Sequence, residues 1–265
     1  MMITKHYFKR LLVEPIGLAI NVFFPVLLVF INVTVNVNAM EGGDTLFSGY
    51  SVTATSIATL IMVMFQFMYG THMVDLFFRD FKNSRRWRLL AAPASLSKYL
   101  FSIMMASVFF SVLTGVLIMA VAAIALNAHV HNPFVLLTVI VIIAVFSQVF
   151  GMLVSLLIRK KGVAEAVCVL FSFFMIVPSG DFLVTININI HALNVFFNYM
   201  TPYAQAMRAI MASGIMGNSV SDNFGGALQY MGRDMSTALL NMGTLTATTI
   251  LLAIIVVIVS RRRSF

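Results

Sequence analysis

The sequence predicts an all-α integral membrane protein with six transmembrane helices, and three observations support this fold class. Hydrophobic residues make up 60% of the chain and charged residues only 10%, which is outside the usual composition of soluble domains. The apolar residues gather in stretches close to the length of about 20 residues that a helix needs to cross a hydrocarbon core of about 30 Å. The 17 Lys and Arg residues, apart from Arg208 and Arg233, lie at alternate ends of these stretches.

The predicted spans are separated by short polar segments. They cover about Ile16–Asn36, Ser51–Thr71, Tyr99–Leu126, Phe134–Ile158, Val163–Gly180 and Thr237–Ser260. Because basic residues concentrate in cytoplasmic loops, their alternation predicts a multi-pass protein of the cell membrane with both termini in the cytoplasm. The spans and short loops leave no room for a soluble domain, so residues 1–265 are expected to form one transmembrane domain.

The segment before the first span, residues 1–15, is predicted to be an interfacial helix on the cytoplasmic leaflet. At 100° per residue, one half of this helix is apolar and the other half is basic. The apolar half includes Tyr7 and Phe8, and the basic half includes Lys5, Lys9 and Arg10. Within the first span, Pro25 is predicted to kink the helix because proline has no backbone N–H to donate.

The longest basic loop, Asp75–Ser97, is predicted to contain a short helix between the second and third spans. Asn83 or Ser84 can cap this helix, and Pro93 stops it. Its central residues are Arg85, Arg86, Trp87, Arg88, Leu89 and Leu90. A helix anchored at both ends to membrane helices is suited to transmit a push, although a loop that only fixes the topology remains an alternative.

The fifth span ends in the turn-forming residues Pro178, Ser179 and Gly180, and an Asn-rich segment follows. A seventh span is not expected there, because unpaired amides are costly in lipid and an odd count would place Arg261–Arg263 outside. This segment is therefore predicted to be external or re-entrant. A short helix is expected after Pro202, before the last span.

Several kinds of chemistry lack the residues that they need. The sequence has no G-x-x-x-x-G-K-[ST] run and no H-E-x-x-H run, so neither a P-loop ATPase site nor a zinc-hydrolase site of those patterns is expected. His129 and His131 have no acidic or cysteine neighbours, so no metal site is predicted. The net charge of +8 is explained by topology, so nucleic acid is not an expected partner.

The predicted spans hold essentially no charged residue at mid-membrane, where ion-coupled carriers usually keep one. Their polar side chains are the candidates for lining a path through the membrane. They are Asn21, Asn32, Thr59, Gln66, Gln148 and Asn241. The alternative for such residues is hydrogen bonding within a helix or between packed helices.

Three features together resemble the ABC-2-type permeases, the transmembrane subunits of bacterial ABC exporters. An amphipathic basic helix precedes the first span. The loop after the second span runs into a Leu-Leu-x-x-Pro pattern, here Leu89 to Pro93. The fifth span ends in the Pro/Ser/Gly break, and a stretch from Asn198 through Pro202 to Arg208 follows it. The acidic residue and glycine that usually precede Leu-Leu-x-x-Pro are replaced here by the basic run from Arg79 to Arg88.

This resemblance implies a function and a set of partners. The helix around Arg85–Leu90 would dock as a coupling helix on a separate ABC-type ATPase subunit, which binds the ATP and Mg²⁺, so the chain itself is expected to be no enzyme and to hold no cofactor. The segment with Pro178, Ser179, Gly180 and Pro202 would form re-entrant helices at the exit. Two permease subunits, either identical or paralogous, would pair in the plasma membrane of a bacterium.

The Phe- and Met-rich spans suit an amphiphilic or hydrophobic cargo, such as a drug, an antimicrobial peptide or a lipid-linked molecule, so a role in multidrug resistance is among the expectations. Two other classes remain open from the residues alone. One is a passive or ion-coupled channel or carrier, and the other is a membrane immunity or scaffold protein that does not transport.

Overall fold

The regular structure of the chain is helical throughout the part that the computed structural model describes, and this part contains no strand. The described residues are 2–13, 19–40, 46–81, 96–128, 130, 132–176, 196, 200–210, 212 and 235–262. The principal helices are α1 (Met2–Val13), the π-helix η1 (Ala19–Phe23), α3 (Phe24–Met40), α4 (Leu46–Met68), α5 (Gly70–Phe81), α7 (Leu96–Ala125), α8 (Pro133–Leu157), α9 (Lys161–Ile176), α11 (Pro202–Ile210) and α12 (Met235–Arg262). The predicted all-α class is confirmed.

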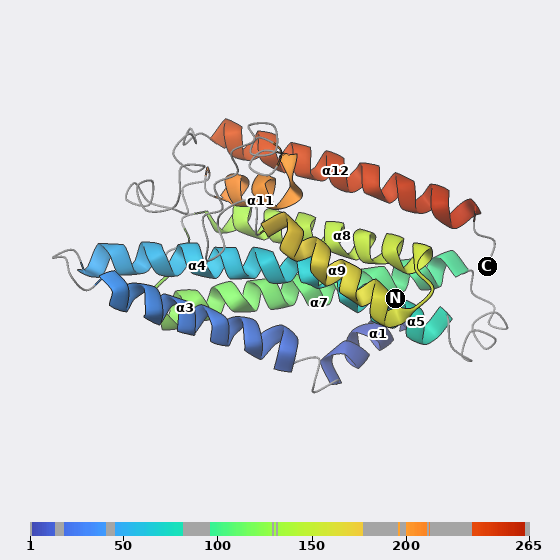
Figure 1. Cartoon of the computed structure of the whole chain (residues 1–265), viewed down its shortest axis with the longest axis horizontal. Helices are drawn as coiled ribbons and strands as arrows, with labels where there is room; N and C mark the ends of the chain where they lie inside the picture. Colours follow the sequence, from blue (N-terminus) through green and yellow to red (C-terminus); the bar gives the residue numbers. More distant parts are fainter. Residues whose placement is uncertain are drawn as a thin grey trace.

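Most of the long helices lie side by side along the long axis of the molecule (Figure 1). Four of the described helices are long and apolar enough to cross a membrane, and they correspond to the second, third, fourth and sixth predicted spans. They are Ala54–Phe81, Lys98–Ala125, Pro133–Leu157 and Met235–Ser260. The first and fifth predicted spans correspond to η1 with α3, where the apolar run is Asn21–Val35, and to the shorter α9.

The start of α1, the end of α5 and the end of α12 lie toward the same end of the molecule (Figure 1), which we call the basic end because Arg10, Arg79 and Lys161 meet there. The helix α11 lies toward the opposite end, packed between α12 and α8. Local sequence explains several boundaries. For example, Asn132 caps α8 by accepting a hydrogen bond from the backbone N–H of Val135, and Pro133 occupies the first helical position.

The second span is longer than the sequence suggested. Its predicted end was Thr71, followed by a loop from Asp75, whereas the helix is interrupted at Tyr69 and continues as α5 to Phe81. The charged side chains of α5 had indicated a loop, but Asp75 and Arg79 lie on one side of an amphipathic helix, and the buried Asp80 is paired with Arg10. The buried apolar side chains are Met73, Val74, Leu76, Phe77, Phe78 and Phe81. Burial of this apolar side is what keeps the segment helical.

The buried apolar residues form two clusters rather than one. The inner core lies toward the basic end and joins α5 to Tyr7 and Leu11 of α1, to the first half of α7 and to the second half of α8. The outer core joins α4 to α3, to the second half of α7, to the first half of α8 and to α11. Tyr69, the residue between α4 and α5, therefore separates a helix of the outer core, α4, from a helix of the inner core, α5.

The π-helix η1 ends two residues before Pro25, where the sequence predicts a kink. Because proline has no N–H, the carbonyl of Asn21 cannot receive the usual hydrogen bond from the residue four positions later. The hydroxyl of Tyr69 donates to this carbonyl instead, at 2.5 Å. The hydrogen bond from Tyr69 to the carbonyl of Asn21 therefore links the start of the first predicted span to the end of α4.

Candidate functional site

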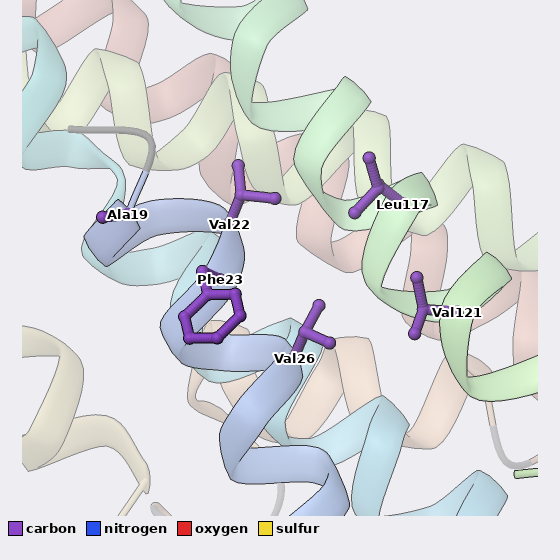
Figure 2. Close-up of a pocket in the computed structure, with 6 residues that line it drawn as sticks. All are labelled: Ala19, Val22, Phe23, Val26, Leu117 and Val121. Carbon is purple, nitrogen blue, oxygen red and sulfur yellow. The ribbon is translucent and has the colours of Figure 1, made fainter. Parts of the chain in front are cut away.

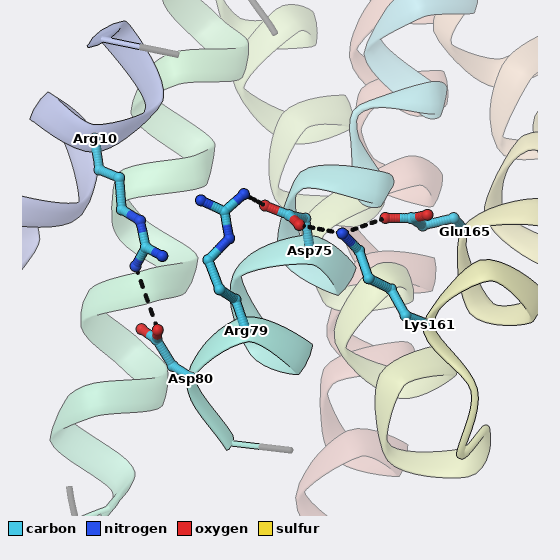
Figure 3. A network of polar contacts seen from close by, with 6 residues as sticks. All are labelled: Arg10, Asp75, Arg79, Asp80, Lys161 and Glu165. Carbon is cyan, nitrogen blue, oxygen red and sulfur yellow. Dashed lines mark hydrogen bonds and ion pairs between the residues drawn. The ribbon is translucent and has the colours of Figure 1, made fainter. Parts of the chain in front are cut away.

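An ion-pair network joins three helices at the basic end (Figure 3). Asp75 of α5 is at its centre, with one carboxylate oxygen 2.7 Å from a guanidinium nitrogen of Arg79 and the other 2.5 Å from the ammonium of Lys161 on α9. Lys161 also lies 3.4 Å from a carboxylate oxygen of Glu165, one turn further along α9. The side chain of Asp75 is only 17% exposed, so these partners compensate a largely desolvated charge.

A second ion pair ties α5 to α1. The guanidinium of Arg10 lies 3.3 Å from a carboxylate oxygen of Asp80, whose side chain is only 6% exposed. Tyr7, one turn before Arg10, is buried and forms a hydrogen bond with Asp80. Burial, reinforced by this hydrogen bond, raises the pKa of Tyr7 well above its ordinary value. The phenol therefore stays protonated and can act as a donor to the carboxylate.

These contacts hold α5 between α1 and α9. The hydrogen bond to Asp75 raises the pKa of Lys161 further above its ordinary value, so the ammonium remains charged across the physiological range. The clamped helix ends at Phe81, directly before residues 82–95. A displacement of that segment would therefore pull on α5 and, through the ion pairs, on α1 and α9.

A second group of polar contacts surrounds the joint between α4 and α5. The side chains of Gln66 and Ser111 form a reciprocal pair: the amide of Gln66 donates to the carbonyl of Ser111 at 2.8 Å, and the hydroxyl of Ser111 donates to the amide oxygen at 2.6 Å. The amide of Gln148 on α8 donates to the carbonyl of Tyr69 at 2.9 Å. Both glutamine side chains are fully buried.

Glycines allow the helices to approach at the same level. A Cβ on Gly70 would lie 2.7 Å from the carbonyl oxygen of Ser147, and a Cβ on Gly151 would overlap the carbonyl group of Gly70. A Cβ on Gly115 would overlap the amide of Gln66. We call the residues of this region the polar layer; they are Gln66, Tyr69, Gly70, Ser111, Gly115, Gln148 and Gly151.

The residues predicted on the interfacial helix lie as the helical pattern indicates. The observed helix α1 spans Met2–Val13, Tyr7 is buried in the inner core, and Phe8 packs against it. Lys5 and Lys9 are exposed, whereas Arg10 is drawn into the pair with Asp80. The position of this helix on a membrane surface stays a prediction.

The six polar residues predicted to line a path fall into two groups. The first group makes contacts between helices: Gln66 pairs with Ser111, Gln148 donates to the backbone carbonyl of Tyr69, and the backbone carbonyl of Asn21 accepts from the Tyr69 hydroxyl. Asn32 and Asn241 donate to carbonyls of their own helices, Leu28 and Thr237, and Thr59 is fully buried on α4. Their role in a path stays a prediction.

Two predicted segments lie outside the described residues: the coupling helix with Arg85, Arg86, Trp87, Arg88, Leu89 and Leu90, and the turn with Pro178, Ser179 and Gly180. The predicted helix after Pro202 is present as α11. Thr201 caps it, since its hydroxyl accepts a hydrogen bond from the N–H of Ala204 at 3.2 Å. Residues 203–210 of α11 are all buried.

The sequence interpretation missed the acidic residues of the network. Asp75 and Glu165 were placed at the ends of spans, and Asp80 within a loop. Their pairing had a visible signal, because Asp75 with Arg79, and Lys161 with Glu165, are opposite charges four residues apart and so face each other on a helix. No comparable signal identified Tyr69, Gly70 or Gly151, whose partners lie on other helices.

An apolar groove of about 420 Å³ lies between the start of the first predicted span and α7 (Figure 2). Its lining residues are Ala19, Val22, Phe23, Val26, Leu117 and Val121. The groove offers only hydrocarbon, which matches lipid chains as well as any other apolar surface, so it distinguishes no ligand.

Comparison with known protein families gives a match over most of the chain. The model of the family described as "ABC-2 family transporter protein" matches residues 16–258. No curated protein sequence matches the chain significantly.

Proposed function

Because the chain belongs to the ABC-2 family of transporter proteins, we propose that it is the membrane-spanning permease subunit of an ATP-driven exporter. It crosses the plasma membrane of a bacterium six times, with both termini in the cytoplasm. ATP and Mg²⁺ are bound by a separate ABC-type ATPase subunit, and two permease subunits, identical or paralogous, form the transporter. The cargo is amphiphilic or hydrophobic.

The observation that supports this proposal best is the set of ion pairs that hold α5 to α1 and α9. A permease without its own ATPase has to receive movement from its partner and pass it to membrane helices. Residues 85–90 are the proposed docking site, with Trp87 and Leu90 as apolar anchors and the arginines meeting acidic residues of the ATPase. The helix before them is tied by ion pairs to α1 and α9, so three helices receive the movement together.

In this proposal the predicted path residues line the route of the cargo through the membrane. Gln66 and Gln148 belong to the polar layer, Asn21 is bonded to it through its backbone carbonyl, and Thr59, Asn32 and Asn241 offer further polar groups along the helices. We place the exit at the opposite end, near α11 and the segment that begins at Pro178. The cargo passes between the two permease subunits.

Docking is tested by a double substitution in the proposed coupling helix. A Trp87→Asp, Arg88→Glu protein is expected to lose co-purification with the ABC-type ATPase encoded beside it, because one change removes the apolar anchor and the other repels the acidic site. The measurement is pull-down of the ATPase from detergent extracts, together with its ATP hydrolysis.

The matched control is Lys160→Glu, which reverses an exposed charge at the same end of the molecule. This control is expected to retain the ATPase. Full retention of the ATPase by the double variant would remove the proposed docking site. Absence of any ABC-type ATPase from the purified wild-type complex would remove the proposed function itself.

A further inference from the structure

The polar layer lies where the two apolar cores meet. On α4 and α5 the boundary falls between Tyr69, which belongs to the outer core, and Met73, which belongs to the inner core. On α7 it falls between Phe110 and Ile118, and on α8 between Phe146 and Val149. Ser111 and Gln148 lie within these intervals, so hydrogen bonds replace apolar packing at the boundary.

The regular helix is interrupted at the same place. Tyr69 is not part of a helix: its N–H donates to the carbonyl of Phe65, and its own carbonyl receives hydrogen bonds from the N–H of His72 and from the side chain of Gln148. The link between α4 and α5 therefore receives a hydrogen bond from a side chain of α8 in addition to its own backbone hydrogen bonds. Gly70 and Gly151 bring the two backbones together directly beside it.

The hydrogen bonding of the layer is incomplete in this arrangement. Among the residues that the structure describes, the amide oxygen of Gln148 has no hydrogen-bond partner, and its side chain is fully buried. A buried polar atom without a partner is costly, and more so within a lipid-surrounded bundle that offers no water in exchange. The amide oxygen of Gln148 is therefore free to accept a hydrogen bond when the surrounding helices move.

From this geometry we infer that Tyr69 and Gln148 are positioning residues of a pivot at which α5 tilts relative to α4 and α8, the amide of Gln148 exchanging its partners as it does so. The tilt is centred on the contact between Gly70 and Gly151, because two backbones without Cβ atoms can change their crossing angle without a steric clash. The inference rests on the proposed function, since the tilt is what carries movement of the segment after Phe81 to the outer core.

The contacts on either side of the pivot differ in kind, as expected if α5 moves relative to the outer core. On the inner side, α5 is fastened to α1 and α9 by charged pairs, so the three helices move together. On the outer side, Gln66 fastens α4 to α7, and Tyr69 fastens the joint to the carbonyl of Asn21. Separation of Asp75 or Asp80 from its cation would leave a largely desolvated carboxylate without compensation, whereas the neutral amide of Gln148 can exchange one hydrogen-bond partner for another. Movement is therefore expected at the layer rather than at the basic end.

The experiment measures the tilt in the complex with the ATPase through α9, which is ion-paired to α5. Spin labels are placed at two exposed positions, Val163 on α9 and Leu137 in the outer half of α8, after replacement of the buried Cys168 by serine. In the wild-type background the distance between the labels is expected to shift when Mg·ATP is added. In a Gln148→Met background, which keeps the length of the side chain but removes its amide, the shift is expected to disappear while ATP hydrolysis continues.

Two further variants complete the design. Tyr69→Phe removes only the hydroxyl that donates to Asn21, and is expected to reduce the shift as well, so the test remains available if Gln148→Met fails to fold. Ser172→Ala is the control, because this buried hydroxyl donates to the carbonyl of Cys168 in its own helix. It is expected to leave both the shift and the hydrolysis unchanged.

The outcomes separate the pivot from the proposed function. A full ATP-dependent shift in both the Gln148→Met and the Tyr69→Phe proteins would overturn the pivot and leave the exporter function intact. The same holds for a wild-type complex that hydrolyses ATP without any shift. A chain that recruits no ATPase and supports no hydrolysis would overturn the proposed function instead.

Discussion

A Gly151→Ala protein is expected to lose about 1–3 kcal/mol of folding free energy, the range for an extra methyl group forced into a packed interior. The added Cβ would overlap the carbonyl group of Gly70, which is backbone and cannot rotate away. The helices α5 and α8 must therefore separate, which also strains the hydrogen bond between Gln148 and Tyr69. Unfolding of the detergent-solubilised protein, followed by circular dichroism, measures the loss.

The matched control is Gly243→Ala on α12. A Cβ at that position meets no atom within 4 Å, so this change is expected to leave stability unaltered or to raise it, as alanine favours helix over glycine by about 1 kcal/mol. If both variants unfold alike, the close approach of α5 and α8 is not a determinant of the fold.

Arg10→Met is expected to cost about 1–3 kcal/mol, the range for leaving a buried polar partner unsatisfied. The substitution keeps the apolar stem of the side chain but leaves the carboxylate of Asp80 without its cation, and that carboxylate is only 6% exposed. The loss appears as a lower unfolding midpoint, and α1 is expected to become more sensitive to proteolysis.

A double-mutant cycle with Asp80→Asn isolates the pair, because the neutral amide no longer needs a cation. The Arg10→Met, Asp80→Asn protein is expected to be more stable than Arg10→Met alone. Lys9→Met serves as the control, since Lys9 is exposed on the same helix and should tolerate the change. Equal effects of Arg10→Met and Lys9→Met would show that the pair does not hold α1 to α5.

The sequence predicts the helices well wherever hydrophobic periodicity decides the structure. The helix α1 was expected from the opposed faces of Tyr7 and Lys9, and it is observed with Tyr7 buried and Lys9 exposed. The spans that became α7, α8 and α12 follow from apolar runs alone. The end of the second span was misplaced, because Asp75 and Arg79 resemble loop residues until their partners on other helices are known.

The contacts of the candidate site depend on tertiary packing, which periodicity does not contain. Gln66 and Gln148 were selected for their polarity, but their pairing with Ser111 and with the Tyr69 carbonyl brings together α4, α7 and α8. Likewise, Pro25 predicts a kink in the first span, but it does not predict that Tyr69 donates a hydrogen bond to this region. The hydrogen bond from Tyr69 to Asn21 joins residues 48 positions apart.

The most direct test of this account is uptake into inside-out proteoliposomes, measured with a labelled amphiphilic dye, an antimicrobial peptide and a lipid analogue. Liposomes with the chain, its ABC-type ATPase and Mg·ATP are expected to accumulate at least one of these compounds. Liposomes with the chain alone, or with the complex but no ATP, are expected to accumulate none. Equal uptake by the chain alone would contradict the account, because movement of cargo would then need neither the ATPase nor the clamped helix α5.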